Sequence, residues 1–186
     1  MVRIALDRSG IKKIKRKILG RMQETDAYEI VHNDGYENEE GPITDWMNYE
    51  DTKNDEGYYE WPAYFELFME NAEEAIIEAI DQMYDVSGEA AVGNVWFQQY
   101  TRNKEHSWHY HWSCLFHAIY YVELPEGTPP TLCKAAGGFE YTPNVKEGDI
   151  LIMPSTIKHC SPINNSDRRK TIIAVNIDMD PAVCDD

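Results

Sequence analysis

Hydrophobic positions recur at helical spacing in the first half of the chain and at alternate positions in the second half. Residues 62–84 carry an apolar stripe at spacings of three and four, and Pro62 stands where a first-turn proline is tolerated. This pattern predicts a helix that buries one face. A second, short amphipathic helix with a basic face is expected over residues 11–24. Residues 34–58 are rich in Asn, Asp, Glu and Gly, which is typical of a long loop.

From Gly93 onwards the hydrophobic period becomes two, as in strands that alternate between two faces. Helices followed by short strands with turns between them favour a mainly β fold, a β-sandwich or jelly roll with flanking N-terminal helices packed on one sheet. We expect one domain over residues 1–186, with a helical and loop extension over 1–92 and the core over 93–180. The expected strands cover residues 95–100, 107–121, 139–141, 149–153 and 171–177.

Charge and cysteine content narrow the class of protein. The chain has 186 residues and a formal net charge of −16, and a surface this acidic repels phosphate backbones, so no nucleic-acid partner is expected. No apolar run approaches the length of a membrane span, and the N-terminus lacks the apolar segment of a secretory signal. We therefore expect no membrane partner and a cytoplasmic protein whose four cysteines are free thiols.

Histidines in the strand-rich half point to a metal site. His109 and His111 are two residues apart, so on a strand they face the same side. His159 follows a later predicted strand and can meet them across a small barrel. Three imidazoles on one side of an ion leave the other side open, as in catalytic rather than structural sites. We predict these three as metal ligands, with iron, copper, nickel, manganese and zinc all open.

Further side chains are expected around this site. His117 has the same parity as His109 and His111, and we expect His117, His106 and Trp96 to face a substrate or to support the ligands. Tyr110 and Trp112 have the opposite parity and are expected to pack against a helix. Aromatic walls are expected from Trp96, Tyr100, Trp108, Tyr110 and Trp112.

A cluster of cations enters the last predicted strand. The guanidinium of Arg169 is suited to hold a carboxylate through two parallel hydrogen bonds, and the Thr171 hydroxyl, which faces the same way, is suited to add a third. The other interpretation is a solvated turn with its charges in water, which we favour for Arg168.

Taken together, these residues resemble the iron(II)- and 2-oxoglutarate-dependent oxygenases, especially their small members in bacteria and phages. The resemblance spans Gly93 to Asp178, and each motif is weak alone while their order and spacing together are more specific. The residues that carry it are His109-x-His111 with Ser113 and Ala118–Val122, the Glu147–Pro154 strand leading to His159, Asn164, Arg169-Lys170-Thr171 and, upstream, Thr44-Asp45-Trp46.

The resemblance implies a double-stranded β-helix, ferrous iron (Fe2+) and 2-oxoglutarate as co-substrate. It implies a dioxygenase that uses O2 to hydroxylate a C–H bond of a small-molecule or peptide substrate, with release of succinate and CO2. Arg169, assisted by Thr171, would hold the distal carboxylate of 2-oxoglutarate, with Lys170 as the alternative one position along. Tyr100 and Tyr121 would complete the co-substrate site.

One position departs from the family pattern. The family has His-x-Asp or His-x-Glu followed by a distal histidine, whereas here His111 stands at the carboxylate position. Imidazole is a good iron ligand, so a three-histidine site is chemically sound, and it is more positive by one charge.

Two other classes of protein stay open. A cupin-type metalloenzyme shares the jelly roll and the His-x-His…His set, although Leu115 and Phe116 stand where the first cupin motif has a glutamate. A non-enzymatic jelly-roll protein with a structural or binding role would keep its histidines as core residues.

Overall fold

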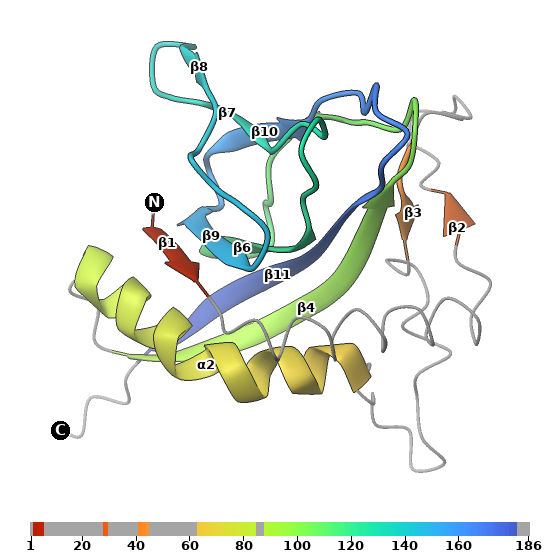
Figure 1. Ribbon diagram of the computed structural model, residues 1–186. Coiled ribbons are helices and arrows are strands. Elements are labelled where there is room, and N and C mark those ends of the chain that lie inside the picture. The colour runs from red at the N-terminus through yellow and green to blue at the C-terminus, as the bar shows by residue number, and fades with distance from the viewer. Residues whose placement is uncertain (1, 6–27, 30–40, 45–62, 85–87, 182–186) are drawn as a thin grey trace, which may run out of the picture.

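The computed structural model of the protein describes residues 2–5, 28–29, 41–44, 63–84 and 88–181 (Figure 1). The basic helix expected over residues 11–24 and most of the loop expected over 34–58 lie outside these ranges. Within them, no helix has the length and apolar composition needed to cross a membrane. The three cysteines they contain, Cys114, Cys133 and Cys160, are buried free thiols.

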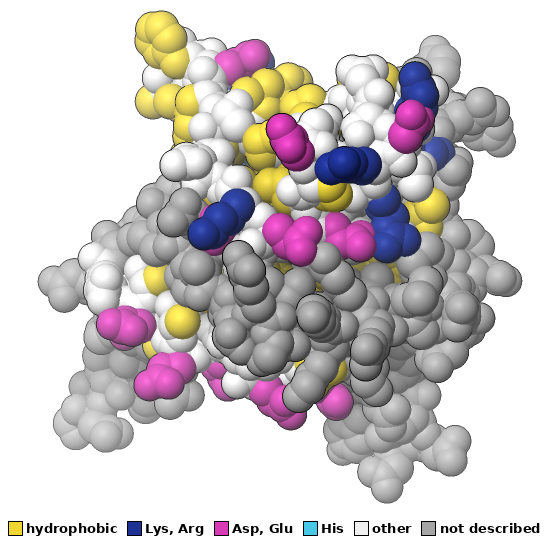
Figure 2. Space-filling view, in the orientation of Figure 1, with side chains coloured by type: hydrophobic (Ala, Val, Ile, Leu, Met, Phe, Trp, Pro, Cys, Tyr) yellow, Lys and Arg dark blue, Asp and Glu magenta, His cyan; other side chains and the backbone are white. Residues whose placement is uncertain are grey.

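The helix predicted in the first half is confirmed as α2 (Ala63–Tyr84). Its apolar stripe is buried, whereas its acidic side chains face outward, along the lower edge of the molecule as seen in Figure 2. Aromatic contacts fix the helix to the sheet. The ring of Tyr64 lies edge-on to that of Phe97 at 6.0 Å, and the ring of Phe68 lies 5.2 Å from that of Tyr120. Glu66 in the first turn complements the positive end of the helix dipole.

The strands form two antiparallel sheets that lie one above the other, with α2 beneath the larger (Figure 1). The seven-stranded sheet has the order β1-β9-β6-β11-β4-β3-β2 and the four-stranded sheet the order β5-β10-β7-β8. The strands are β1 (Val2–Ala5), β2 (Tyr28–Glu29), β3 (Ile43–Thr44), β4 (Gly88–Tyr100), β5 (His106–His109), β6 (Phe116–Glu123), β7 (Leu132–Lys134), β8 (Glu140–Tyr141), β9 (Asp149–Pro154), β10 (Lys158–Ser161) and β11 (Lys170–Pro181).

The large sheet is covered on both faces, which creates two separate cores. The helix-side core consists of Tyr64, Phe65, Phe68, Ala72, Ile76, Ala79 and Ile80 of α2 with Val95, Phe97, Phe116, Ala118, Tyr120, Val122, Ile150, Ile152, Ile173, Val175 and Ile177 of the sheet. The inter-sheet core consists of Tyr100, Ile119, Tyr121, Cys133, Leu151, Met153 and Ile172. Successive residues of β4, β6, β9 and β11 alternate between these cores, as the period of two requires.

The single strand predicted over residues 107–121 is wrong. The chain forms β5, turns at residues 110–115 and continues as β6, because β5 belongs to the small sheet and β6 to the large one. The His111 amide donates to the Ser155 carbonyl at 3.3 Å, and the Ser155 amide donates to the Leu115 carbonyl at 3.0 Å, which holds the turn. The alternation of inward and outward side chains continues from β5 to β6 across the turn. It does so because each of these strands presents one face to the space between the sheets.

Candidate metal centre

The three predicted ligands come together between the two sheets. His109 ends β5 and is paired directly with His159 of β10, and His111 follows in the turn. One ligand atom of each side chain lies within 4.8 Å of those of the other two. The ring centroids are 4.3 Å apart for His109 and His159, and 5.2 Å apart for His111 and either of them. Three imidazoles thus converge on one point.

Backbone carbonyls fix the tautomers of two of these rings. Nδ1 of His109 lies 2.7 Å from the carbonyl of Ser107, and Nδ1 of His159 lies 3.0 Å from the carbonyl of Ile157. A carbonyl only accepts, so each Nδ1 carries the proton and each Nε2 carries the lone pair. Metal-binding histidines are oriented in this way by a second hydrogen bond from the opposite ring nitrogen.

The third ring offers the strongest sign that an ion fits. Nε2 of His111 is buried and has no hydrogen-bond partner among the described residues. An unsatisfied buried polar atom costs about 1–3 kcal/mol. A metal ion bound to this nitrogen would remove that cost, so the donor set fits a metal ion.

Burial keeps the imidazoles of His111 and His159 neutral, the form that binds a metal. Desolvation lowers the pKa of His159 to about 3 and that of His111 to about 4. Neighbouring histidines lower both further, while a hydrogen bond raises each in part, from the Ile157 carbonyl for His159 and from Asn176 for His111.

The other predicted histidines and Trp96 surround the centre. His117 is buried, stacks on His111 at a centroid distance of 3.6 Å, and contacts the side-chain oxygen of Asn176 through Nδ1 at 3.2 Å. His106 stacks on His109 at 4.0 Å, and the Trp96 ring stacks on His111 at 5.9 Å. These residues line the same cavity as the ligands, so they can hold the ligand rings in place.

The cavity between these side chains is small, about 20 Å³. This is room for about one water molecule or an ion. Its wall also includes polar residues that the sequence reasoning did not single out, Gln98, Thr131 and Ser161. For Gln98 a signal was available, since it shares its parity with Trp96 and Tyr100.

Arg169 and Thr171 lie away from this cavity. The Arg169 guanidinium donates to both carboxylate oxygens of Glu123, at 2.8 and 3.0 Å, and its side chain is 42% exposed. The Thr171 hydroxyl donates to the same carboxylate. The two residues do share a direction, as expected, but strand alternation turns that direction away from the metal centre.

Lys170, the alternative, points the opposite way. It is fully buried, and its Nζ donates to the Ser161 hydroxyl at 2.6 Å and to the Pro129 carbonyl at 3.1 Å. The Nζ also lies 4.6 Å from the centre of the Tyr100 ring. Burial lowers the pKa of Lys170 to about 7. Because Tyr100 and Ser161 line the metal cavity, Lys170 is the cation behind its inner wall.

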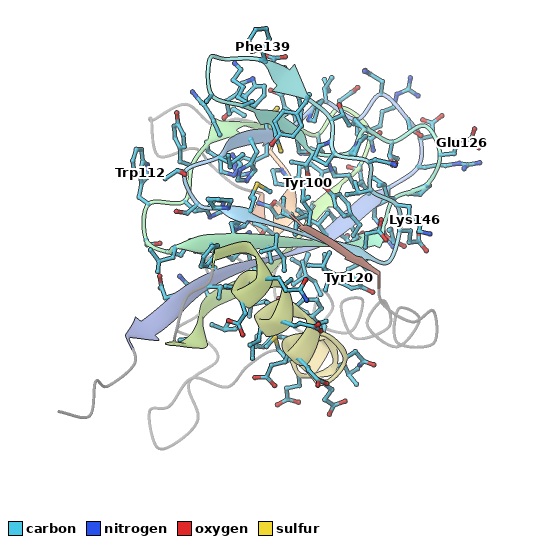
Figure 3. All side chains as sticks on the ribbon, turned by 90° about the vertical axis from the view of Figure 1, so that its left-hand side faces the viewer. Tyr100, Trp112, Tyr120, Glu126, Phe139 and Lys146 are labelled. Carbon is cyan, nitrogen blue, oxygen red and sulfur yellow. The ribbon has the colours of Figure 1, made fainter. Side chains whose placement is uncertain are left out.

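The two tyrosines expected in the co-substrate site are both buried between the sheets. Tyr100 lies at the centre of Figure 3, and its hydroxyl donates to Gln98 at 2.7 Å. The Tyr121 hydroxyl donates to Thr131 at 2.8 Å. Desolvation raises the pKa of both hydroxyls, so both are neutral donors at ordinary pH.

The expectation that Tyr110 and Trp112 pack against a helix is wrong. Both are on the turn after β5, where 38% of Tyr110 and 88% of Trp112 are exposed. Figure 3 shows Trp112 at the edge of the molecule. Their rings contact each other at 5.2 Å, and the Nζ of Lys158 lies over the Tyr110 ring. Strand parity does not apply to them, because they are on a turn and not on a strand.

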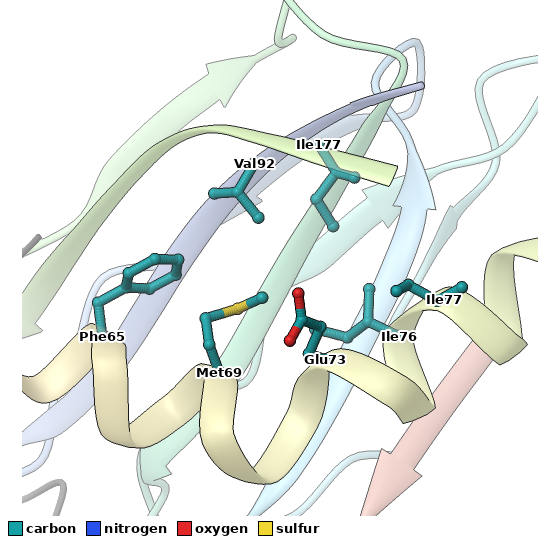
Figure 4. A pocket seen from close by; sticks show the side chains of 7 residues that line it. All are labelled: Phe65, Met69, Glu73, Ile76, Ile77, Val92 and Ile177. Carbon is teal, nitrogen blue, oxygen red and sulfur yellow. The ribbon is translucent and has the colours of Figure 1, made fainter. Parts of the chain in front are cut away.

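A larger cavity, about 310 Å³, lies between α2 and the strands β4 and β11 (Figure 4). Its wall is apolar apart from Glu73, and it contains none of the predicted site residues. The candidate metal ligands are therefore on the other side of the sheet.

No family model and no curated protein sequence matches the chain, but solved structures do. A prolyl-4-hydroxylase of Pseudomonas putida has a TM-score of 0.67 and 16% identity, covering 94% of this chain and 90% of its own. SnoK, a non-haem α-ketoglutarate-dependent carbocyclase from nogalamycin biosynthesis, has a TM-score of 0.68 and 11% identity, covering 99% and 83%.

A third similar structure is the viral collagen prolyl hydroxylase of Paramecium bursaria Chlorella virus-1 in complex with 2-oxoglutarate. Its TM-score is 0.60 and its identity 14%, covering 95% of this chain and 94% of its own. At these identities the likeness establishes a common fold. The predicted fold class, a jelly roll or double-stranded β-helix with N-terminal helices packed on one sheet, is thereby confirmed, and α2 is the one of these helices within the described residues.

Proposed function

We propose that the protein is an iron(II)- and 2-oxoglutarate-dependent oxygenase that hydroxylates a C–H bond of a small-molecule or peptide substrate. The observation that carries this proposal is the convergence of His109, His111 and His159, with the buried Nε2 of His111 lacking a partner among the described residues. The fold supports it, because solved structures of the same fold include a prolyl-4-hydroxylase and an α-ketoglutarate-dependent carbocyclase.

The three histidines would hold the ferrous ion through their Nε2 atoms. With ferrous iron and 2-oxoglutarate bound, the chemistry supplied is the reduction of O2, with one oxygen atom going to the substrate C–H bond and the other to succinate as CO2 is released. The protein's part is to orient the ligands through the carbonyls of Ser107 and Ile157 and to keep water away. Trp96, Ile119 and Ile172 form the apolar wall that does so.

Lys170 is the residue we propose for the distal carboxylate of 2-oxoglutarate, in place of Arg169. Its Nζ is buried beside Tyr100 and Ser161, whereas the Arg169 guanidinium is already paired with Glu123. A carboxylate at this position would favour the ammonium form of Lys170 and give it a charged partner. The cavity of about 20 Å³ is too small for 2-oxoglutarate, so binding requires the side chains between the histidines and Lys170 to move.

The test is an anaerobic titration of the metal-free protein with ferrous iron and then 2-oxoglutarate. The expected result is a visible charge-transfer band that needs both additions. Lys170→Met should abolish the band at 2-oxoglutarate concentrations that saturate the wild type, and the neighbouring Arg169→Ala should retain it. A band lost in Arg169→Ala but kept in Lys170→Met would contradict the assignment of Lys170.

Two further outcomes would contradict the proposed function itself. Iron binding without the band at any 2-oxoglutarate concentration would favour a cupin-type metalloenzyme that does not use this co-substrate. Failure to bind iron, with thermal stability unchanged by iron, cobalt or nickel, would favour a non-enzymatic jelly-roll protein, since a ligand of the folded state must stabilise it.

A further inference from the structure

The turn that follows β5 presents three large apolar side chains on the surface of the molecule. Trp112 is 88% exposed, Leu115 is 54% exposed and Tyr110 is 38% exposed. Apolar side chains that are exposed close together are typical of binding surfaces, and Trp and Tyr are the residues that contribute most often to binding there. We refer to these three residues as the turn platform.

The backbone holds the turn platform in a fixed position. The Leu115 amide donates to the carboxylate of Asp178 at 3.0 Å, and the Leu115 carbonyl accepts from the Ser155 amide at 3.0 Å. The rings of Tyr110 and Trp112 contact each other at a centroid distance of 5.2 Å. Because these side chains start from a fixed backbone, a partner that binds them orders little of the chain.

The turn platform lies beside the open side of the metal centre. His109 and His111 are partly exposed, whereas His159 and His117 are buried. Solvent therefore reaches the centre from the end of β5, where the turn begins. Trp112 follows His111 directly in the chain but does not line the metal cavity, and it lies at the edge of the molecule in Figure 3.

A ligand that contacts both the turn platform and the metal centre must extend across the turn. His111 reaches the cavity from one side of the turn, and Trp112 projects into solvent. An extended polypeptide advances by about 3.3 Å per residue, so a few residues are enough to cross the turn. A compact molecule bound against the metal would not touch the platform. The geometry therefore favours a polypeptide segment over a small molecule.

The charge of the chain favours a basic segment. The chain has 33 acidic residues and 17 Lys and Arg residues, which gives the formal net charge of −16. A field of this sign attracts and orients cationic partners. Next to the platform, the described charges include one of each sign, Lys158 at the Tyr110 ring and Asp178 at the Leu115 amide. The field of the whole chain therefore decides which charge is attracted.

Aromatic rings around the metal centre already pair with ammonium groups of this chain. The pairs are Lys134 over Trp108, Lys158 over Tyr110 and Lys170 over Tyr100, with Nζ at 4.2, 5.4 and 4.6 Å from the ring centres. Tryptophan is the best acceptor of such a contact. The indole of Trp112 is exposed to solvent, so it is suited to receive a cation from a partner.

We propose that the substrate hydroxylated by the protein is a basic polypeptide segment, and that the turn platform binds it. A Lys or Arg side chain of the segment stacks on Trp112, apolar parts of the segment contact Tyr110 and Leu115, and a residue a few positions along reaches the metal centre. The inference rests on the proposed function and names its substrate class.

The first experiment measures peptide binding to the metal-free protein, so it does not depend on the oxygenase chemistry. Two labelled peptides of equal length are compared by fluorescence anisotropy, one with repeated Lys and Arg residues and one with Glu at each of those positions. The basic peptide should bind, with an affinity that falls as salt is added, and the acidic peptide should not. Tighter binding of the acidic peptide would overturn the inference.

A matched set of variants tests whether Trp112 receives the cation. Trp112→Leu keeps an apolar side chain without an aromatic face, and it should bind the basic peptide about fivefold more weakly than the wild type. Trp112→Phe keeps an aromatic face and should lose about twofold or less. Phe139→Ala is the control, because it removes a ring that is 78% exposed at a different edge of the molecule (Figure 3). Equal binding by Trp112→Leu and Phe139→Ala would overturn the inference, since the acidic surface as a whole would then be responsible.

Lys158 provides a test of the sign of the charge. Lys158→Met removes an ammonium that repels a basic segment and opens one face of the Tyr110 ring. It should therefore bind the basic peptide about twofold more tightly than the wild type. Weaker binding of the basic peptide by Lys158→Met would contradict the assignment of a cationic partner.

The second experiment tests whether the bound segment is a substrate. A mixture of basic peptides, with every residue type present between the cations, should stimulate succinate release by the wild type with ferrous iron, 2-oxoglutarate and O2. Trp112→Leu should raise the KM for the mixture by about fivefold, with little change in the rate at saturation. Its Co2+ affinity should equal that of the wild type.

The outcomes separate this inference from the proposed function. If iron and 2-oxoglutarate give the charge-transfer band but basic peptides do not stimulate succinate release, the proposed function stands and the substrate class is wrong. If the band is absent while Trp112→Leu still weakens peptide binding, the proposed function is wrong, the role as substrate fails with it, and only the binding of basic segments stands.

Discussion

The helix-side core and the inter-sheet core are built on opposite faces of the same strands, yet they differ in chemistry. On β4, Val95 and Phe97 face α2, whereas Trp96, Gln98 and Tyr100 line or border the metal cavity. The helix-side core contains almost only apolar atoms. The inter-sheet side buries His117, His159, Lys170 and Asn176 as well.

The two faces of this sheet therefore have different roles, stability on one face and the candidate metal site on the other. Burial of apolar side chains against α2 supplies stability, at about 25 cal/mol per Å² of apolar surface. Burial of imidazoles and an ammonium opposes stability unless a ligand compensates them. We therefore expect changes on one face to alter stability with little effect on metal binding, and changes on the other face to do the reverse.

The largest effect is expected in the helix-side core. Phe97 is fully buried against Tyr64, so Phe97→Ala should lower the free energy of unfolding by about 3–5 kcal/mol. Urea unfolding measures this, and Phe139→Ala, at a ring that is 78% exposed, is the control with little change. Below its unfolding transition, Phe97→Ala should keep the Co2+ affinity of the wild type. A lost metal site in a folded Phe97→Ala protein would argue against separate roles for the two faces.

A smaller but selective effect is expected at a ligand. His159→Ala should weaken Co2+ binding by more than about 100-fold, because even residues that only support a ligand commonly contribute 10–100-fold. His106→Ala, which removes a ring stacked on His109, should cause about tenfold loss or less. Isothermal titration of both metal-free variants compares them, and equal losses would mean that His159 is not a ligand.

A pH effect should distinguish the buried ammonium. The pKa of Lys170 is about 7 in the folded protein and about 10.4 in an unfolded chain. Between these values the unfolded chain binds more protons, so the stability of the metal-free protein should rise with pH, by about 1 kcal/mol per unit. Urea unfolding between pH 7 and 8.5 measures it as the difference in slope between the wild type and Lys170→Met. The difference is needed because histidines and cysteines of the unfolded chain, whose pKa values are shifted in the folded protein, also titrate near the two ends of this range.

The same series needs a variant without the titrating group. In Lys170→Met the slope of stability against pH should be smaller than in the wild type by about 1 kcal/mol per unit, and the protein should be more stable than the wild type at pH 7. An equal slope in the two proteins would assign the pH dependence to groups other than Lys170.

The smallest effect is expected at the neighbouring cation. Arg169 is paired with Glu123 in an exposed position, so Arg169→Ala should change the free energy of unfolding by less than about 1 kcal/mol. Its Co2+ affinity should equal that of the wild type. Measured beside Lys170→Met, it compares two cations on successive residues that face opposite sides of one strand, and a large loss of metal or 2-oxoglutarate binding would reverse the assignment.

Sequence periodicity predicted much of this arrangement. The apolar stripe of α2 and the alternation in β4, β6, β9 and β11 are long enough to identify each element. The short strands β1, β2, β3, β7 and β10 were not predicted, because segments of two to four residues are too short to show a hydrophobic period. The division of the chain at residue 93 stays a prediction, although β1 and β3 from the first part join the large sheet.

The candidate site was predictable in its histidines and less so in its cation. His109 and His159 follow from spacing and parity, and they pair directly in the small sheet. The choice between Arg169 and Lys170 depended on the register of β11, because a shift of one position moves a side chain from the interior to the surface. The sequence does not fix that register. The sequence did not predict the exposure of Trp112, because the alternation of inward and outward side chains is the same on both sides of the turn at 110–115. The turn therefore leaves no signal in the pattern.

Two of the three proposed metal ligands face each other across one rung of the β5–β10 ladder, while His111 lies in the turn beyond it. The separation of His109 and His159 is thereby inherited from backbone pairing, which tolerates many changes in the surrounding side chains. His111, in contrast, is not held in place by strand pairing. It is the point at which a single substitution can alter the affinity and the preferred metal of the centre while the barrel stays intact, and so the point from which new reactivity is most accessible to evolution or to an engineer.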